Sequence, residues 1–227
     1  MDTMFDTLLQ LPLFQGLSQD DFTSILEKVK LDFTKYKSGE VIVRTDTDCD
    51  GLLFILKGKI KALTVASALP VTVIECIQAP YLIEPYSLFG MNVRHVSSYV
   101  AETEVHVVRI SKSYVLSVLF DFEIFRLNYL NILSNRVQIL TQKLWNIGIV
   151  DLDKRIAIFF LNCFERLTGE KVVKIKMQDL ASLMNETRSN VSKALNTLQE
   201  KELLILHRGE VVISDAADLS HFCNQSD

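Results

Sequence analysis

One short segment, residues 186–200 with the sequence ETRSNVSKALNTLQE, carries side chains that could read a nucleic acid. On a helical wheel of about 100° per residue, its apolar side chains gather on one face and its short polar and basic side chains on the other. Arg and Lys can donate to guanine, Asn can pair with adenine, and Ser permits close approach in the DNA major groove. The predicted DNA-binding residues are Thr187, as the helix N-cap, with Arg188, Ser189, Asn190, Ser192, Lys193 and Asn196.

The elements around this segment are expected to position it as the second helix of a helix-turn-helix. A strongly apolar helix begins near residue 151, and a second helix, MQDLASLMNE, offers Leu180, Leu183 and Met184 for packing. A short turn at residues 185–187 joins it to the polar-faced helix, and the hairpin LLILHRGEVVIS follows with Gly209 in its turn. A lone amphipathic helix would more simply be a solvated surface helix. The order of the four elements favours a winged DNA-binding domain.

Residues 121–149 show a different period, that of a coiled-coil seam. Apolar side chains alternate spacings of three and four over roughly two and a half heptads. We interpret this stripe as a parallel dimer interface; the alternative is a helix packed on its own domain. The predicted interface residues are Leu130, Leu133, Val137, Leu140, Leu144 and Ile147.

Residues 1–120 read mostly as short strands after a helical start of about 35 residues. The expected strands are Glu40–Thr45, Gly51–Val65, Val71–Ile77 and Glu104–Ile110, and Ser18 with Asp21 is a capping signal for the helix before them. Short strands at close spacing indicate a β-sandwich or barrel. The expected domains are a sensing β-domain (1–120), a dimerisation helix (121–149) and a DNA-binding domain (150–227).

Composition narrows the class of protein. The net charge of −4 excludes a chain coated in basic charge but permits a local basic face. No apolar run reaches the length of a membrane helix, and the acidic start lacks a basic signal region, so we expect a cytoplasmic protein with no membrane partner. The four cysteines are dispersed, which predicts buried free thiols and no iron–sulfur cluster.

The residues do not predict an enzyme. A metal-dependent β-barrel enzyme would need clustered histidines, whereas His95, His106, His207 and His221 are dispersed. A Gly-rich phosphate loop, a nucleophile elbow and zinc-ligand spacing are also absent from the sequence. A winged fold that binds a ligand or a protein without DNA remains the third alternative.

Over essentially its whole length the sequence resembles the Crp/Fnr family of bacterial transcription regulators. PLFQGLSQDDF and YKSGEVIVRTDTDCDGLLFILKGKIKA are similar to its β-domain, DKRIAIFFL and MQDLASLMNETRSNVSKALNTLQEKELL to its DNA-binding domain. The resemblance implies an α+β fold: an N-terminal double-stranded β-helix (a cyclic-nucleotide-binding-like jelly roll), a long dimerisation helix and a C-terminal winged helix-turn-helix. It also implies a homodimer on a palindromic operator, with RNA polymerase as a partner.

The resemblance also identifies departures from the family at the DNA-reading positions. The family often places Arg, Glu and Arg where this chain has Arg188, Ser189 and Lys193. Lys193 replaces a bidentate Arg with a point charge. The common family operator is therefore not carried over to this chain.

The effector site departs further. The family's cassette is Gly-Glu, a spacer and Arg-Ser/Thr-Ala. Here Gly90 is the candidate for the Gly, Met91 stands in place of the Glu, and residues 95–97 lie near the Arg-Ser-Ala, with Arg94 the nearest cation. Without a paired Arg, cyclic AMP is not the expected effector. The candidate effector-pocket residues are Tyr86, Leu88, Phe89, Met91, Ser97 and Ser98.

Four alternatives remain open for this apolar loop. It could be core packing, it could form a pocket for a small apolar ligand, it could respond to a cyclic nucleotide, or it could belong to a haem-based sensor of redox state or nitric oxide. For haem, the candidate axial ligands are His95, His106 and Met91. No cofactor is assigned from the sequence, nor does it tell whether transcription rises or falls.

Overall fold

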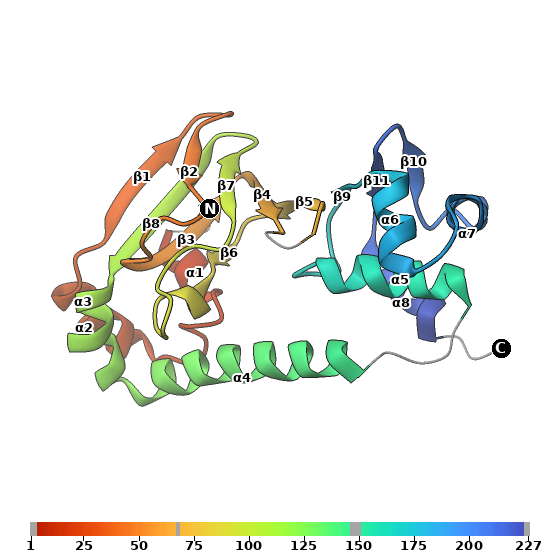
Figure 1. The fold of residues 1–227 in the computed structure, drawn as a ribbon. Helices are drawn as coiled ribbons and strands as arrows, with labels where there is room; N and C mark the ends of the chain where they lie inside the picture. Colours follow the sequence, from red (N-terminus) through yellow and green to blue (C-terminus); the bar gives the residue numbers. More distant parts are fainter. Residues whose placement is uncertain (1–3, 67–68, 146–150, 225–227) are drawn as a thin grey trace. The chain divides into compact units, whose positions relative to one another are not determined.

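A computed structural model describes residues 4–66, 69–145 and 151–224 of the chain. The chain divides into two compact units (Figure 1). Each unit has its own hydrophobic core. The first unit contains Met1–Lys61 and Ile77–Thr141, and the second contains Ala62–Cys76 and Gln142–Asp227. Each unit is therefore assembled from two separate stretches of sequence.

Short strands in two sheets form the body of the first unit. They are β1 (Asp32–Tyr36), β2 (Val41–Val43), β3 (Gly51–Lys57), β4 (Lys59–Val65, which continues into the second unit), β6 (Tyr81–Ile83), β7 (Ser98–Ala101) and β8 (Val105–Ser111). One sheet has the order β1-β8-β3-β6, and β7 pairs with β2 in the other. The long apolar run from Gly51 to Val65 is split by Gly58, whose φ of +100° makes the turn between β3 and β4.

Helices close the first unit around an aromatic core. They are α1 (Met4–Leu9), α2 (Gln19–Lys28), the 3₁₀ helix η1 (Pro85–Ser87), α3 (Lys112–Ser117), the 3₁₀ helix η2 (Leu119–Asp121) and α4 (Glu123–Trp145). The ring of Phe14 lies 5.4 Å from that of Phe54 in β3 and 5.6 Å from that of Phe125 in α4, measured between centroids. Ser18 caps α2 by accepting from the backbone N–H of Asp21, as the sequence predicts.

The second unit is a helical domain with a small antiparallel sheet. Its elements are α5 (Leu152–Cys163), β9 (Lys171–Lys174), α6 (Met177–Met184), α7 (Arg188–Glu200), β10 (Ile205–His207), β11 (Glu210–Ile213) and α8 (Ala216–Asn224), with part of β5 (Thr72–Gln78). The sheet order within this unit is β10-β11-β9-β5. Phe160 of α5 and Leu198 of α7 are fully buried in its core. The predicted hairpin is β10 and β11, with Gly209 in its turn at a φ of +82°.

The strand β5 completes the second unit, although it comes from the middle of the expected β-domain. Val71 and Val73 are buried in the core of this unit, and Val73 pairs with Val173 of β9. Glu75 and Lys171 form an ion pair of 3.0 Å in which both side chains are buried. The segment at residues 62–76 is therefore a structural part of the helical unit.

Candidate nucleic-acid interface and effector pocket

The helices α6 and α7 form the predicted helix-turn-helix. Asn185 ends α6 in the left-handed conformation with a φ of 52°, and the backbone N–H of Glu186 donates to the carbonyl of Ala181. Thr187 then caps α7, because its hydroxyl accepts from the backbone N–H of Asn190 at 3.2 Å. The expected N-cap is thus present, and the turn is as short as a helix-turn-helix requires.

The two faces of α7 separate as the helical wheel predicts. Val191, Ala194, Leu195 and Leu198 are buried, so this face anchors the helix to the core. The structure brings all seven candidate DNA-binding residues together on the remaining surface of one helix and its cap. Of these, Thr187, Arg188, Ser189, Asn190, Lys193 and Asn196 are exposed, and Ser192 is half-buried.

One acidic residue, Glu186, lies just before the start of α7 and is held by neighbouring side chains. Glu186 lies 3.5 Å from Arg155 of α5, and its other oxygen accepts from the side-chain amide of Asn190 at 3.1 Å. Arg155 also donates to the carbonyl of Met184. The acid is thereby neutralised in part and holds Asn190 in one orientation.

The two cations on α7 are differently placed. Within the described part of the chain, neither Arg188 nor Lys193 forms an ion pair. The first turn of α7 contains no acidic side chain. The exposed N-terminal end of this helix therefore presents positive charge and free donors, which suits an anionic partner.

Three further cations, which the sequence analysis did not single out, lie near the end of β9 and the turn of the β10–β11 hairpin. This hairpin is the wing of the helix-turn-helix domain. Lys174 ends β9 opposite Glu210 in β11, and Lys176 is the N-cap residue of α6. The backbone N–H of Ile175, between them, donates to the carbonyl of Gly209 in the wing turn beside Arg208. The spaced lysines of KVVKIK and the HRG turn were the signal for this group.

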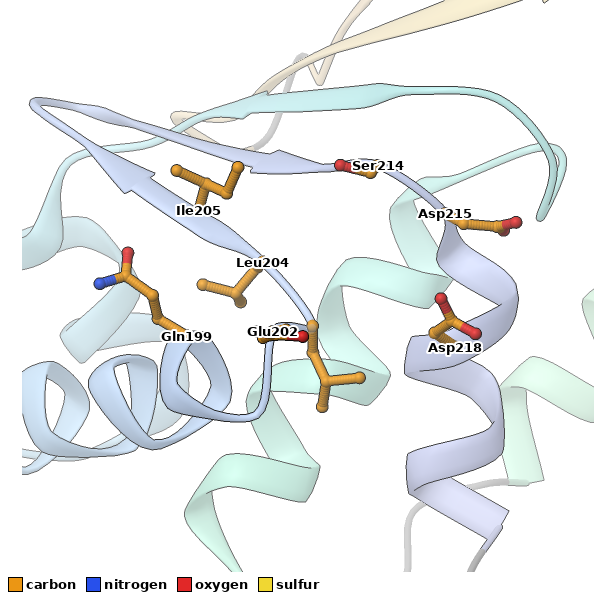
Figure 2. A pocket seen from close by; sticks show the side chains of 8 residues that line it. Gln199, Glu202, Leu204, Ile205, Ser214, Asp215 and Asp218 are labelled. Atoms are coloured by element: carbon orange, nitrogen blue, oxygen red, sulfur yellow. The ribbon is translucent and has the colours of Figure 1, made fainter.

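A hollow on the opposite end of α7 has the wrong charge for DNA. A cavity of about 260 Å³ is bounded by the end of α7, β10 and the start of α8. Figure 2 shows Glu202, Asp215 and Asp218 around it, with Leu204 and Ile205. Carboxylates repel phosphate, so this end of α7 suits an anionic partner less well than the end that bears Arg188.

The predicted dimer stripe lies on α4. Leu130, Val137 and Leu140 are exposed by 57%, 62% and 46%, which is unusual for large apolar side chains on one helix. Leu133 is half-buried against the core of the first unit. Leu127, one turn earlier, is also exposed and was not predicted. The side chain of Leu144 and all of Ile147 lie outside the residues that the structure describes.

The candidate effector-pocket residues do not share one environment. Leu88 is fully buried in the core, whereas Met91 is fully exposed. Phe89 and Ser98 are half-buried, and Ser97 is buried. The ring of Tyr86 lies under the guanidinium of Arg136 on α4, at 4.9 Å from the centroid. The structure therefore does not gather Leu88 and Met91 around a common space.

The loop at residues 84–89 is instead tied to α4. The hydroxyl of Tyr129 donates to the carbonyl of Pro85 at 2.5 Å, and Arg136 stacks on Tyr86. The loop at residues 84–89 and the exposed stripe are therefore joined to the same helix.

A buried carboxylate lies at the start of this loop. Glu84 is fully buried and has a φ of 35°, in the left-handed region that residues other than glycine seldom adopt. Its oxygens accept from the backbone N–H groups of Val96 and Ser97 and from two hydroxyls. Nδ1 of His95 lies 3.4 Å away, at ion-pair distance but without hydrogen-bond geometry.

This network lowers the pKa of Glu84 and raises the pKa of His95, and both shifts favour the charged form. Burial alone would raise the pKa of Glu84, but the neighbouring His95 and the hydrogen bonds from Val96, Ser97 and Ser87 lower it. Burial alone would lower the pKa of His95, but Cys49 and Glu84 raise it to about 9. Glu84 and His95 are therefore both charged near neutral pH.

The nearest cation from the sequence analysis is engaged elsewhere. Arg94 lies 3.1 Å from Asp46 and 3.7 Å from Asp48, on the surface. Residues 84–87 make a tight turn, with Glu84 in the left-handed conformation and a 3₁₀ helix over the next three residues. Gly90 does have a φ of +106°, but a side chain there would meet nothing within 4 Å.

The candidate haem ligands do not fit a haem. His95 is buried beside Glu84, and Nε2 of His106 contacts Glu104 at 3.0 Å. Met91 is fully exposed, so it offers no enclosed axial position. Among the described residues, no group of three His, Cys, Asp or Glu side chains is placed to hold a metal ion.

No described helix is long and apolar enough to cross a membrane.

Comparisons with known proteins agree with both units. Residues 154–222 match the family model of the Crp-like helix-turn-helix domain, and residues 33–122 match that of the cyclic nucleotide-binding domain. The chain is similar in structure to the catabolite activator protein of Thermus thermophilus, with 19% identity, a TM-score of 0.53 and coverage of 94% of this chain and 98% of that one. No curated protein matches the sequence.

A second solved structure gives the same result. A transcriptional regulator of the Crp/Fnr family from Eubacterium rectale has 19% identity, a TM-score of 0.53 and coverage of 95% of this chain and 99% of that one. At this level of identity the likeness supports the fold. The predicted fold, a jelly-roll β-domain followed by a long helix and a winged helix-turn-helix, is confirmed.

Proposed function

The chain belongs to the Crp/Fnr family of DNA-binding transcription regulators, and on this premise we propose that it is a homodimer that reads a palindromic operator under the control of an effector other than cyclic AMP. The observation that carries the proposal is the exposed face of α7, with Arg188 and Lys193 among short polar side chains above a buried apolar face. Members of the family are regulators of transcription and not enzymes.

In this proposal the exposed face of α7 enters the major groove. Arg188 and Lys193 donate to guanine, while Asn190 and Asn196 pair with adenine. Thr187, Ser189 and Ser192 approach the DNA closely as short donors and acceptors. Lys174, Lys176 and Arg208 bind backbone phosphates at the flank, where they add affinity but little sequence preference.

Dimerisation is proposed through the stripe on α4, from Leu130 toward Ile147. Pairing of two copies would cover the exposed side chains of Leu130, Val137 and Leu140, whose exposure supports this assignment. Two-fold symmetry then presents two copies of α7 to half-sites about one helical turn apart. As proposed functional parts, residues 1–120 sense, 121–149 dimerise and 150–227 bind DNA.

Two features of the first unit support an effector that is not cyclic AMP. Arg94 is paired with Asp46 and Asp48, so it does not offer its charge to a cyclic phosphate. The backbone donors of Val96 and Ser97, near the family's Arg-Ser-Ala position, are already occupied by the buried carboxylate of Glu84, so they are not offered to a phosphate. We further propose that RNA polymerase is a partner and that the regulator acts in the cytoplasm, where bacterial DNA lies.

The proposal is tested by selecting operators from random-sequence DNA with the full chain. We expect a palindromic sequence to be enriched and its affinity to fall linearly on a plot of log affinity against log salt. A matched shuffled sequence is the control, and it should bind more weakly at every salt concentration. Enrichment of no sequence, or equal affinity for the shuffled control, would contradict sequence-specific DNA binding.

A further inference from the structure

The surroundings of Glu84 resemble a site built for an anion more than an ordinary core contact. Two consecutive backbone N–H groups, those of Val96 and Ser97, point at the same carboxylate at 2.8 and 2.9 Å. Successive backbone donors that converge on one group can bind an anion, and we call residues 95–97, which carry these two donors, the nest. The hydroxyls of Ser87 and Tyr99 add donors at 3.0 and 3.2 Å. Each oxygen of the carboxylate thus accepts at least two hydrogen bonds.

A positive side chain completes the site. His95 is buried, carries charge near neutral pH and has Nδ1 at 3.4 Å from the nearer oxygen of Glu84. This nitrogen has no hydrogen-bond partner among the described residues. A buried imidazole at ion-pair distance from a carboxylate supplies positive charge that favours a negative group at this place.

The backbone is bent to bring the carboxylate to this place. Glu84 adopts a φ of 35°, and the 3₁₀ helix η1 begins at the next residue with Pro85. A left-handed conformation at a residue with a long side chain persists only when its surroundings stabilise it. Here the stabilising partners are the donors of the nest, so the turn and the nest depend on one another.

We propose that residues 95–97 form an anion-binding nest that Glu84 occupies as a built-in ligand. The inference deepens the proposed function in one respect: it rests on the first unit being the effector domain and excludes residues 95–97 as the place where an anionic effector binds. The nest is closed to phosphates and carboxylates from outside. The effector is therefore recognised elsewhere in this unit, or it carries no anionic group that needs this nest.

The test vacates the nest and offers it a small anion. Glu84→Ala in the full chain removes the built-in carboxylate and leaves space of about its size. Formate should then raise the melting temperature by roughly 3–6 °C at ten times its Kd, compared with chloride at equal ionic strength. Wild-type protein, Glu84→Gln and the exposed-acid control Glu104→Ala should respond equally to both salts. A folded Glu84→Ala variant with no formate-specific shift would overturn the proposal.

A second measurement decides the question if that variant does not fold. In wild-type protein, the backbone N–H resonances of Val96 and Ser97 should not move when phosphate or cyclic AMP is added. A saturable movement of both resonances would mean that outside anions enter the nest, and the proposal would be wrong. Neither measurement involves DNA, so its outcome is separate from that of the operator selection.

Discussion

At the residue scale, the proposed reading of DNA depends most on Arg188 and Lys193. Each lies exposed on α7 and forms no ion pair within the described residues, so each is available to a base edge. We expect Arg188→Ala and Lys193→Ala each to weaken operator binding by about 1–3 kcal/mol, measured by fluorescence anisotropy. Lys201→Ala removes the same charge near the far end of the helix and should have little effect. Two variants that bind like wild type would move the DNA-reading face elsewhere.

A second residue-scale prediction concerns pH. The pKa of His95 is raised from 6.5 to about 9 in the folded chain, so its charged form stabilises the fold fully below pH 6.5 and this stabilisation is lost as pH rises through about 9. The lowered pKa of Glu84 means that its contribution is lost only in acid. Thermal unfolding should therefore show wild-type stability falling between pH 6.5 and 9, and His95→Gln should lack most of that fall. If the melting temperatures of wild-type protein and His95→Gln change with pH in parallel, the assignment of this pH dependence to His95 is wrong.

At the element scale, α4 carries an exposed apolar stripe, which is the proposed dimer seam. Val137→Asp or Leu140→Asp would place a charge within the proposed seam, at a cost that two paired helices cannot offset by packing. We expect monomers by sedimentation velocity, with weak operator binding. Gln138→Asp adds the same charge at an exposed polar position of α4 and should remain dimeric. Dimers in both seam variants would refute this interface.

The pairing of β5 with β9 makes a further prediction at this scale. Glu75 and Lys171 are both buried, and Glu75 also accepts from the backbone N–H groups of Glu165 and Arg166. Removing one charge leaves the other unpaired, so Glu75→Gln or Lys171→Met should each cost about 3–5 kcal/mol in urea unfolding. The double variant should lose clearly less than the sum of the two. Additive losses would mean that the ion pair does not couple the strands.

The same elements show what a sequence can and cannot predict. The periods of α4 and α7 and the turn at Gly209 are local, so these elements were predicted. β1 was not, because DFTKY is mostly exposed and, among the described strands, it pairs with β8 at the edge of its sheet. The burial of Lys171 depends on Glu75, which is remote in sequence, and the left-handed Glu84 has no local signal. Residues of this kind become visible only when long-range pairing is known.

At the scale of the whole molecule, control must connect an effector domain to DNA. The loop that follows Glu84 is bonded to α4 through Tyr129 and Arg136, and α4 also bears the proposed dimer seam. A change in this loop would therefore be felt by the helix that carries the proposed dimer seam. The confirmed domain classes were predictable, because each has a characteristic order of elements. The partner of the anion nest was not, because it required the side-chain contacts of Glu84.

The segment at residues 62–76 has a practical consequence for protein engineering. The Crp-like family match begins at residue 154, which invites a gene truncation just before it. Such a fragment would lack Val71 and Val73, which are part of the core of this unit. It would also leave β9 as an unpaired sheet edge and leave Lys171 buried without its counter-ion Glu75. Swapping sensory modules between regulators of this type would meet the same obstacle. A soluble DNA-binding fragment or chimera therefore has to include residues 62–76, with β5, as well as the helices of the second unit.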